Sequence, residues 1–390
     1  MTRALRAFYT FVALRWFRLT GALWILYFLH VGWALWQVGV AEAAYHAVSF
    51  ASDVPTGAFA DRIGRRTSVA TGLALAAVAD MALYLIAPGH VFLGTLVMAI
   101  MALSWTFIGG ADAALLHNLA AALPGGAAAY ARLYGRMDAL GLLSGAVAAV
   151  LGGWLAVSRG WLWPYAGEAL AMLLAVPFVL SLPAGRPGGA AEPRPGNLVR
   201  QVIETLGEVR KRPAVLVLVL FGAVLGVVAT SNHLYAQSSL VRKGLSTFGA
   251  TAVIGLGDLA AAASSAASHR LVRRLRALLI VSVLLAVSIS GVGGLPGLLA
   301  VAAYGVSSVA NGATDVLFVT ELNDHAPEEF RAGILSVPSS LFSLGMIVAF
   351  PVEGLLMARV GLGPVYAGLA LLLLVVLALL FRPGRRPRWT

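Results

Sequence analysis

Long apolar runs separated by short polar segments make up almost the whole of this chain. Twelve runs can be marked by the charges, prolines and glycines that bound them. A helix needs about 20 apolar residues to cross a bilayer, and each run is close to that length. The runs lie at residues 12–30, 37–60, 67–87, 91–117, 137–157, 163–182, 213–234, 247–268, 277–295, 297–319, 332–357 and 361–381. They predict an all-α polytopic membrane protein with twelve transmembrane helices.

Basic residues fall mainly in every second loop. If the N-terminus is cytoplasmic, the predicted cytoplasmic segments hold 24 of the 28 Lys and Arg residues, beginning with Arg3, Arg6, Arg15 and Arg18. Lys and Arg concentrate in the cytoplasmic loops of membrane proteins, and one missed span would scramble such a bias. The pattern predicts a multi-pass protein of the plasma (bacterial inner) membrane with both termini in the cytoplasm.

Composition narrows the classes of function. The 390 residues are 59% hydrophobic and 12% charged, with a mean hydropathy of +0.86 and a net charge of +11. In a soluble protein this charge would indicate nucleic acid, but here the loop bias accounts for most of it. We therefore expect the lipid bilayer, and no nucleic acid, as a partner. Because the chain has no cysteine, disulfides, thiol catalysis and thiolate metal sites are excluded, and neither a cofactor nor a metal is predicted.

The chain divides at its longest hydrophilic stretch. Residues 183–212 open as a linker rich in Pro, Gly and Arg and continue as an amphipathic helix. This stretch is either a connector that lets two halves rock or a tether lying on the inner leaflet. The Arg-x-x-Arg-Arg spacing that starts at Arg62 recurs 208 residues later at Arg270. The repeat predicts two pseudo-symmetric six-helix bundles, residues 1–182 and residues 213–390, the second with a basic tail.

The segment from Gly57 to Arg66, Gly-Ala-Phe-Ala-Asp-Arg-Ile-Gly-Arg-Arg, resembles the signature loop of the major facilitator superfamily, G-x-x-x-D-R-x-G-R-R. Just before it, Asp53-Val-Pro-Thr-Gly resembles the acid-x-P-T-G motif of efflux-type members, which usually carry Glu in the first position. The resemblance implies two halves that give alternating access to a midplane site. It also implies that the loop latches the halves together on the cytoplasmic side. The latch residues would be Gly57, Asp61, Arg62, Gly64 and Arg65.

The same loop can be interpreted from its residues alone. Gly57 would allow close helix approach, and Gly64 suits a tight turn or a helix cap. Asp61 could pair with Arg62 or Arg65, or lie against the positive end of a neighbouring helix. An ordinary turn with positive-inside arginines is the alternative, and it explains the arginines but not the acid and both glycines together.

Ionisable groups inside the apolar runs are functional candidates because they are costly in lipid. In the second run Glu42, His46, Ser49 and Asp53 follow one another at spacings of four, three and four, which puts them on one helix face. A line of acids, an imidazole and a hydroxyl can pass a proton. We therefore predict that Glu42, His46 and Asp53 couple transport to protons. Hydrogen bonding that only fixes the packing of this helix is the alternative.

The family resemblance also places the first, fourth, seventh and tenth spans around a central cavity. This adds Asp112 and Asp315 to the acids predicted to couple protons. Aromatic faces with a carboxylate suit a lipophilic cation, although Trp and Tyr near span ends are often interfacial anchors. The predicted substrate-binding residues are Trp24, Tyr27, His30, Trp105, Asn232, His233 and Asn311. Further acids inside the runs are Asp80, Asp258 and Glu353.

The leading function is secondary active transport by alternating access, with proton-coupled export of lipophilic or cationic small molecules. The acid-x-P-T-G resemblance and the apolar, aromatic character of the first and fourth spans favour export. Uptake of a sugar or another metabolite is the alternative, and a sensor on a transporter scaffold is a third possibility. The chain lacks the phosphate-binding motif G-x-x-x-x-G-K-[ST], so an ion gradient is the expected driving force. We expect a monomer whose partners are a small-molecule substrate and protons, and we do not expect an enzyme.

An intramembrane aspartyl protease is the remote alternative. Gly255-Leu-Gly-Asp258 matches the G-x-G-D signature of such enzymes, in which a second Asp completes a catalytic pair. The second Asp normally follows a Tyr on the preceding span. No Tyr-Asp dipeptide occurs in this sequence.

Overall fold

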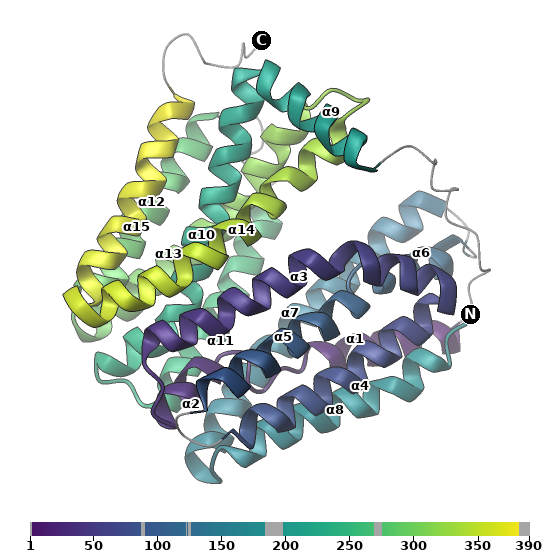
Figure 1. The fold of residues 1–390 in the computed structure, drawn as a ribbon, viewed down its shortest axis with the longest axis horizontal. Coiled ribbons are helices and arrows are strands. Elements are labelled where there is room, and N and C mark those ends of the chain that lie inside the picture. Colours follow the sequence, from purple (N-terminus) through teal and green to yellow (C-terminus); the bar gives the residue numbers. More distant parts are fainter. Residues whose placement is uncertain are drawn as a thin grey trace. The chain divides into compact units, whose positions relative to one another are not determined.

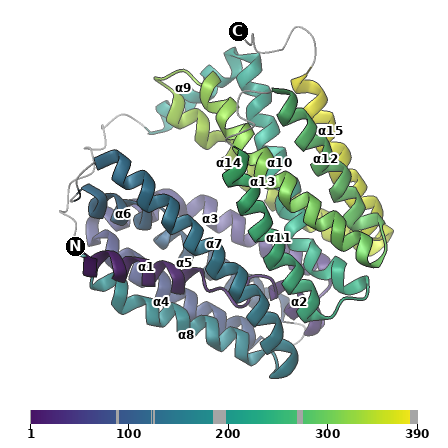
Figure 2. The ribbon, with the colours of Figure 1, turned by 180° about the vertical axis from the view of Figure 1, so that it is seen from behind.

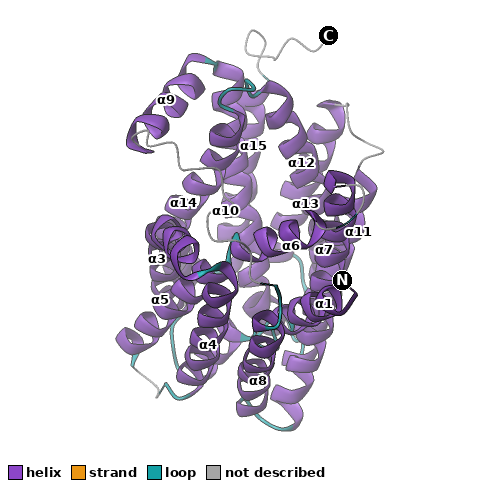
Figure 3. Ribbon diagram, turned by 90° about the vertical axis from the view of Figure 1, so that its right-hand side faces the viewer, coloured by secondary structure: helices purple, strands orange, loops and turns teal. Residues whose placement is uncertain are grey.

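The computed structural model describes every residue except 1, 87–89, 122, 124–125, 184–197, 269–274 and 382–390. The described residues form α-helices joined by loops, and no strand occurs among them (Figure 3). The first eight helices are α1 Thr2–Trp16, α2 Trp24–His30, α3 Leu35–Ile63, α4 Arg65–Tyr84, α5 Val91–Ile108, α6 Ala111–Ala121, α7 Gly126–Ser158 and α8 Leu162–Leu180. The others are α9 Leu198–Lys211, α10 Pro213–Arg242, α11 Thr247–Ala267, α12 Leu275–Gly294, α13 Gly297–His325, α14 Arg331–Val360 and α15 Leu362–Leu380. The predicted all-α fold class is confirmed.

Helix occupies every predicted apolar run, and two of the runs are broken. Nine helical segments in the described part of the chain have the length and hydropathy needed to cross a bilayer. Three predicted runs are not among these nine segments. They are the first run, which is split into α1 and α2, and the runs that form α3 and α13. Within α3 the polar stripe that begins at Glu42 lowers the hydropathy of the helix. The count of twelve spans is compatible with this arrangement.

Contacts between Cα atoms divide the chain into two compact units. Unit 1 comprises Met1–Glu192 and Ser246–Gly255, and unit 2 comprises Pro193–Leu245 and Leu256–Thr390. In unit 1, α4 packs against α5 and α8, α3 packs along α5, and α1 packs against α7 and α8 (Figure 1). In unit 2, α12 packs against α13 and α15, and α10 packs against α13, α14 and α15 (Figure 2).

Large apolar side chains lie on the outside of both units. Phe92 on α5 is 84% exposed and Leu298 on α13 is 82% exposed. Exposed apolar side chains on long helices suit a lipid environment. The helices also satisfy their own backbone polar groups, which lipid cannot do.

Glycines let the helices within each unit approach closely. A Cβ at Gly72 on α4 would lie 2.6 Å from the Ser104 carbonyl oxygen of α5, and one at Gly312 on α13 would lie 2.1 Å from the Ala261 carbonyl oxygen of α11. Small residues at such contacts are typical of membrane helix packing, where close van der Waals contact replaces the hydrophobic effect.

The first span begins earlier than the sequence predicts. α1 starts at Thr2, and Phe8 and Phe11 are fully buried in unit 1. Arg15 is 7% exposed and therefore lies inside unit 1, although its position in the sequence placed it with the basic residues of the N-terminal segment. The loop-charge count treats each arginine near the first apolar run as an orientation signal, and it has no means of recognising one that is ion-paired within the protein.

The predicted amphipathic helix is present as α9. Thr205 and Val209 are buried, and α9 packs against α10 and α14 of unit 2. Thr205 lies against Gly333, where a Cβ would meet the Thr205 Oγ1 at 2.7 Å. α9 is thus attached to unit 2 through its own side chains, while the preceding linker, residues 184–197, lies outside the described residues.

Candidate functional site

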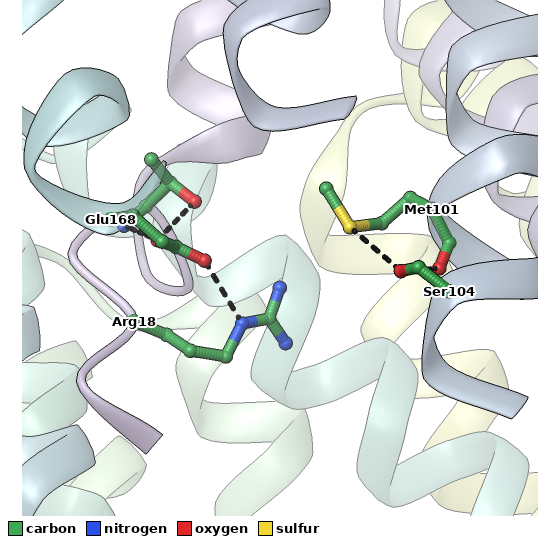
Figure 4. A network of polar contacts seen from close by, with 5 residues as sticks. Arg18, Met101, Ser104 and Glu168 are labelled. Atoms are coloured by element: carbon green, nitrogen blue, oxygen red, sulfur yellow. Dashed lines mark hydrogen bonds and ion pairs between the residues drawn. The ribbon is translucent and has the colours of Figure 1, made fainter. Parts of the chain in front are cut away.

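A break in the first span supplies the first part of the site. α1 ends at Trp16 and α2 begins at Trp24, and the residues between them form turns instead of a continuous helix. Glu168, on α8, fills this gap: its Oε2 accepts from the Thr20 amide at 2.6 Å and from the Thr20 hydroxyl at 2.7 Å. Its Oε1 lies 3.2 Å from the Nε of Arg18, and the two side chains point toward each other (Figure 4).

A second ion pair lies beside this one. Arg15 on α1 donates a hydrogen bond to Asp112 on α6, and both residues are buried. The other carboxylate oxygen of Asp112 accepts from the Ala113 amide at 2.7 Å. Removing one partner of such a pair leaves an uncompensated buried charge, which costs about 3–5 kcal/mol.

Trp105 of α5 joins the two ion pairs. Its ring centre is 4.8 Å from the guanidinium carbon of Arg18 and 5.6 Å from that of Arg15. Cations at these distances are attracted to the electron-rich face of the indole. The ring predicted to receive a cationic substrate thus already interacts with two cations of the protein.

Asp80 of α4 is the unusual member of the network. It is 1% exposed, and neither carboxylate oxygen has a hydrogen-bond partner among the described residues. It interacts electrostatically with Glu168 and Arg18. A buried carboxylate without a donor is costly as an ion. The Arg18 guanidinium therefore has two acids as neighbours, Glu168 and Asp80, and of these it is bonded only to Glu168.

The polar stripe of α3 is partly brought together. Glu42 and His46 are buried and lie 3.4 Å apart, from the carboxylate Oε1 to the imidazole Nε2. Tyr45 interacts electrostatically with Glu42, Arg18 and Asp53. Asp53 itself is exposed, and Ser49 is half-buried. The stripe thus splits into a buried acid–imidazole pair and an exposed acid, Asp53, about two turns beyond His46.

The loop between α3 and α4 forms the predicted turn. Gly64 ends α3 and begins α4 with a φ of 93°, a backbone conformation that favours glycine. Within unit 1 no atom lies within 4 Å of a Cβ built at Gly57, so close helix approach at this residue stays a prediction. Among the described residues Asp61 forms no ion pair, and Arg62 and Arg65 form none either. Their latch role stays a prediction.

Aromatic residues of α2 pack inside unit 1. Tyr27 is 3% exposed, its hydroxyl donates to the Tyr84 carbonyl, and its ring lies 4.9 Å from that of Tyr165. Trp24 contacts Phe28 on the same helix at 5.8 Å. The exposed His30 stacks on Trp161 at 5.3 Å. Tyr27 therefore serves the packing of unit 1, and His30 is the more accessible of these substrate candidates.

A second polar cluster lies within unit 2. His233 on α10 places its Nδ1 3.2 Å from the Tyr304 hydroxyl and 3.5 Å from the Asp258 Oδ1. Asn232 donates to the Ser307 hydroxyl at 3.1 Å. On α13, Asn311 is half-buried and Asp315 is exposed. The cluster therefore holds the predicted Asn232 and His233 and adds Asp258 and Tyr304 to them.

The G-x-G-D segment has a packing explanation. A Cβ at Gly257 would lie 2.7 Å from both the Tyr304 ring and the Ser308 hydroxyl, so glycine permits the contact of α11 with α13. Asp258 pairs with the imidazole of His233, whereas an aspartyl protease needs a second carboxylate in this position. In the part of the chain that the structure describes, no three His, Cys, Asp or Glu side chains gather as metal ligands.

Sequence reasoning did not single out Arg15, Arg18 or Glu168 for the site. The signal for Glu168 was available, because it is the only acid in the apolar run of α8 and an ionisable group in a span is a functional candidate. Arg15 and Arg18 were not recognised as site residues because they follow Arg3 and Arg6, and all four were interpreted as basic residues of the cytoplasmic N-terminal segment.

Comparisons with known proteins give a consistent result. The sequence profile described as Major Facilitator Superfamily matches residues 7–332 of the chain. No curated protein sequence matches it. Among solved structures, a mutant of the nucleoside transporter NupG is 13% identical with a TM-score of 0.80, covering 97% of this chain and 99% of that one.

Two further structures share the fold. A D-xylose-proton symporter is 14% identical with a TM-score of 0.72, covering 98% of this chain and 97% of that one. A bacterial homologue of the human lysosomal transporter Spinster is 15% identical with a TM-score of 0.74, covering 97% and 95%. At these identities the likeness concerns the fold alone.

Proposed function

The chain belongs to the Major Facilitator Superfamily of membrane transporters, and from that premise we propose that it is a proton-coupled secondary transporter that exports lipophilic or cationic small molecules. Residues 1–182 and 213–390 would be the halves that alternate access, joined by residues 183–212. Asp53 in the acid-x-P-T-G segment supports the direction, and the buried acids of unit 1 support the coupling ion.

The observation that carries proton coupling is Asp80 beside the Arg18–Glu168 pair. Glu168 is bonded by the Thr20 amide, the Thr20 hydroxyl and Arg18, whereas Asp80 has no hydrogen-bond partner among the described residues. One cation balances one of the two negative charges, and a proton is the smallest means of neutralising the other. Exchange of Arg18 between the two carboxylates would release that proton and bind it again.

The substrate is expected to avoid Trp105, because Arg15 and Arg18 already occupy its surroundings. The remaining aromatic candidates of unit 1 for a lipophilic cation are Trp24 and His30. Uptake of a hydroxylated metabolite is the second candidate function. It is favoured by the hydrogen-bonding set Asn232, Ser307 and Tyr304 in unit 2 and by the fold that this chain shares with the D-xylose-proton symporter.

Proteoliposomes with an imposed pH gradient test the proposal. Flux of a panel of lipophilic cations and sugars is measured in the wild type, in Asp80→Asn and in Glu329→Gln, which changes an exposed acid in the same chemical way. We expect Asp80→Asn to lose the stimulation of flux by the gradient while it keeps exchange of substrate across the membrane. Gradient-driven flux that is undiminished in Asp80→Asn would refute the role of Asp80. Gradient-driven accumulation of a sugar would favour uptake over export as the function.

A further inference from the structure

Unit 2 contains a buried acid that the proposed coupling site does not use. Glu353 lies on α14, is 6% exposed, and its Oε2 has no hydrogen-bond partner among the described residues. Its polar neighbours are Ser231 of α10 and Tyr366 of α15. No Lys, Arg or His nitrogen of the described chain forms an ion pair with it. A carboxylate in this position has no positive charge to balance it.

Further groups that can carry protons lie in unit 2. Tyr366 is fully buried, and its hydroxyl has no hydrogen-bond partner among the described residues. The Tyr304 hydroxyl lies 3.2 Å from the Nδ1 of His233, which in turn lies 3.5 Å from the Asp258 carboxylate. The side chains of His233 and Asp258 are 39% and 40% exposed. Unit 2 therefore holds two accessible titratable groups and, in Glu353, one buried acid.

Other polar side chains in this part of unit 2 already have hydrogen-bond partners. Tyr235 of α10 donates its hydroxyl to the Phe350 carbonyl of α14 at 2.8 Å. Asn232 and Ser307 bond to each other and carry no titratable proton. The chargeable groups of this region are thus His233 of α10 and Asp258 of α11, and its phenols are Tyr235 of α10, Tyr304 of α13 and Tyr366 of α15.

We infer that Glu353 is a second proton-carrying site of this transporter. The inference rests on the proposed proton coupling and adds a site in unit 2 to the one in unit 1. Each transfer breaks one O–H or N–H bond and forms another. The net change is one proton moved from water to the Glu353 carboxylate, which becomes a neutral acid, and no oxidant or reductant is needed.

Infrared difference spectroscopy of the purified protein tests the site without transport. The absorption of protonated carboxyl groups is titrated with pH in the wild type, in Glu353→Gln and in the control Glu329→Gln. We expect Glu353→Gln, which keeps the shape of the side chain, to lose the signal of one carboxyl, and Glu329→Gln to keep it. A spectrum of Glu353→Gln equal to that of the wild type would overturn the inference.

Transport stoichiometry gives the second test. From reversal potentials in proteoliposomes, Glu353→Gln should move one proton fewer per substrate, whereas the control Glu329→Gln should leave the stoichiometry unchanged. An unchanged stoichiometry in Glu353→Gln would refute the assignment. The assignment would also be refuted if the wild type binds sodium and Glu353→Gln does not, because Glu353 and the oxygen atoms around it would then hold a metal cation instead of a proton. Absence of any pH-driven flux in the wild type would contradict the proposed function, while the infrared titration would still decide on Glu353.

Discussion

Replacing Arg18 by Gln removes the cation that lies between two buried acids of unit 1. At 3.2 Å from the Glu168 Oε1, its charge is worth about 5 kcal/mol of Coulomb attraction at an effective dielectric constant of about 20. The Arg18 side chain is one-third exposed, so solvent screens part of this attraction. The loss should therefore be at the low end of the range for broken buried pairs, about 3 kcal/mol.

Replacing Glu168 by Gln should cost less, about 1–2 kcal/mol. The amide oxygen can still accept from the Thr20 amide and hydroxyl, and Arg18 can turn to the neighbouring Asp80. The double variant Arg18→Gln with Asp80→Asn should recover part of the loss of the single variant Arg18→Gln, because one uncompensated acid is removed with the cation.

Equilibrium unfolding in mixed detergent micelles measures these free energies of unfolding. Lys211→Gln is the matched control, since it removes the cation of an exposed pair with Glu208 and should lower the free energy of unfolding of the whole protein by less than about 1 kcal/mol. The reasoning is refuted if Glu168→Gln destabilises the protein as much as Arg18→Gln, or if Asp80→Asn adds its own loss to that of Arg18→Gln instead of reducing it.

Other variants test further parts of the structure. Asp112→Asn and Arg15→Gln should each destabilise unit 1 by about 3 kcal/mol in the same unfolding assay, and the double variant should lose less than the sum, since the pair is buried. Gly64→Ala should cost about 1–2 kcal/mol because the backbone φ there is 93°, and equal stability would contradict the strained turn. The hydrogen bond from Lys211 at 2.7 Å lowers the pKa of Glu208. Because this pKa is lowered on folding, the stabilisation of α9 is complete above the ordinary value of 4.5 and is lost as the pH falls below it. Amide hydrogen exchange of α9, corrected for intrinsic rates, should show this loss in the wild type but not in Glu208→Gln.

The helices themselves could be predicted from the sequence, because lipid permits long apolar segments little other than helix. The turn at Gly64 was equally predictable, since two spans joined without a loop need a residue that accepts a positive φ. These features depend on neighbours in sequence, and local patterns of apolar residues and glycines determine them.

The polar network could not be predicted in the same way. Glu168 bonds to Thr20 across 148 residues, and Arg15 meets Asp112 across 97. Spacing along one helix reveals only partners on that helix, such as Glu42 and His46. Which acid meets which arginine depends on the order in which helices pack, and a single sequence does not specify that order. The same limit applies to Asp258, whose short motif suggested a protease while its surroundings supply a histidine.

The break between α1 and α2 has a consequence for how the protein tolerates mutation. The Glu168 carboxylate is held partly by the backbone amide of residue 20, which every amino acid except proline provides. Because Thr20 is 3% exposed, position 20 should therefore accept other small residues, such as Ser, Ala or Val, at the cost of at most one hydroxyl contact. Position 168 has no such freedom, because only a side chain with an acceptor at that reach can satisfy the amide and face Arg18 together. A scan of all substitutions at both positions would thus show a permissive site directly opposite a restrictive one, although the two residues share the same hydrogen bond.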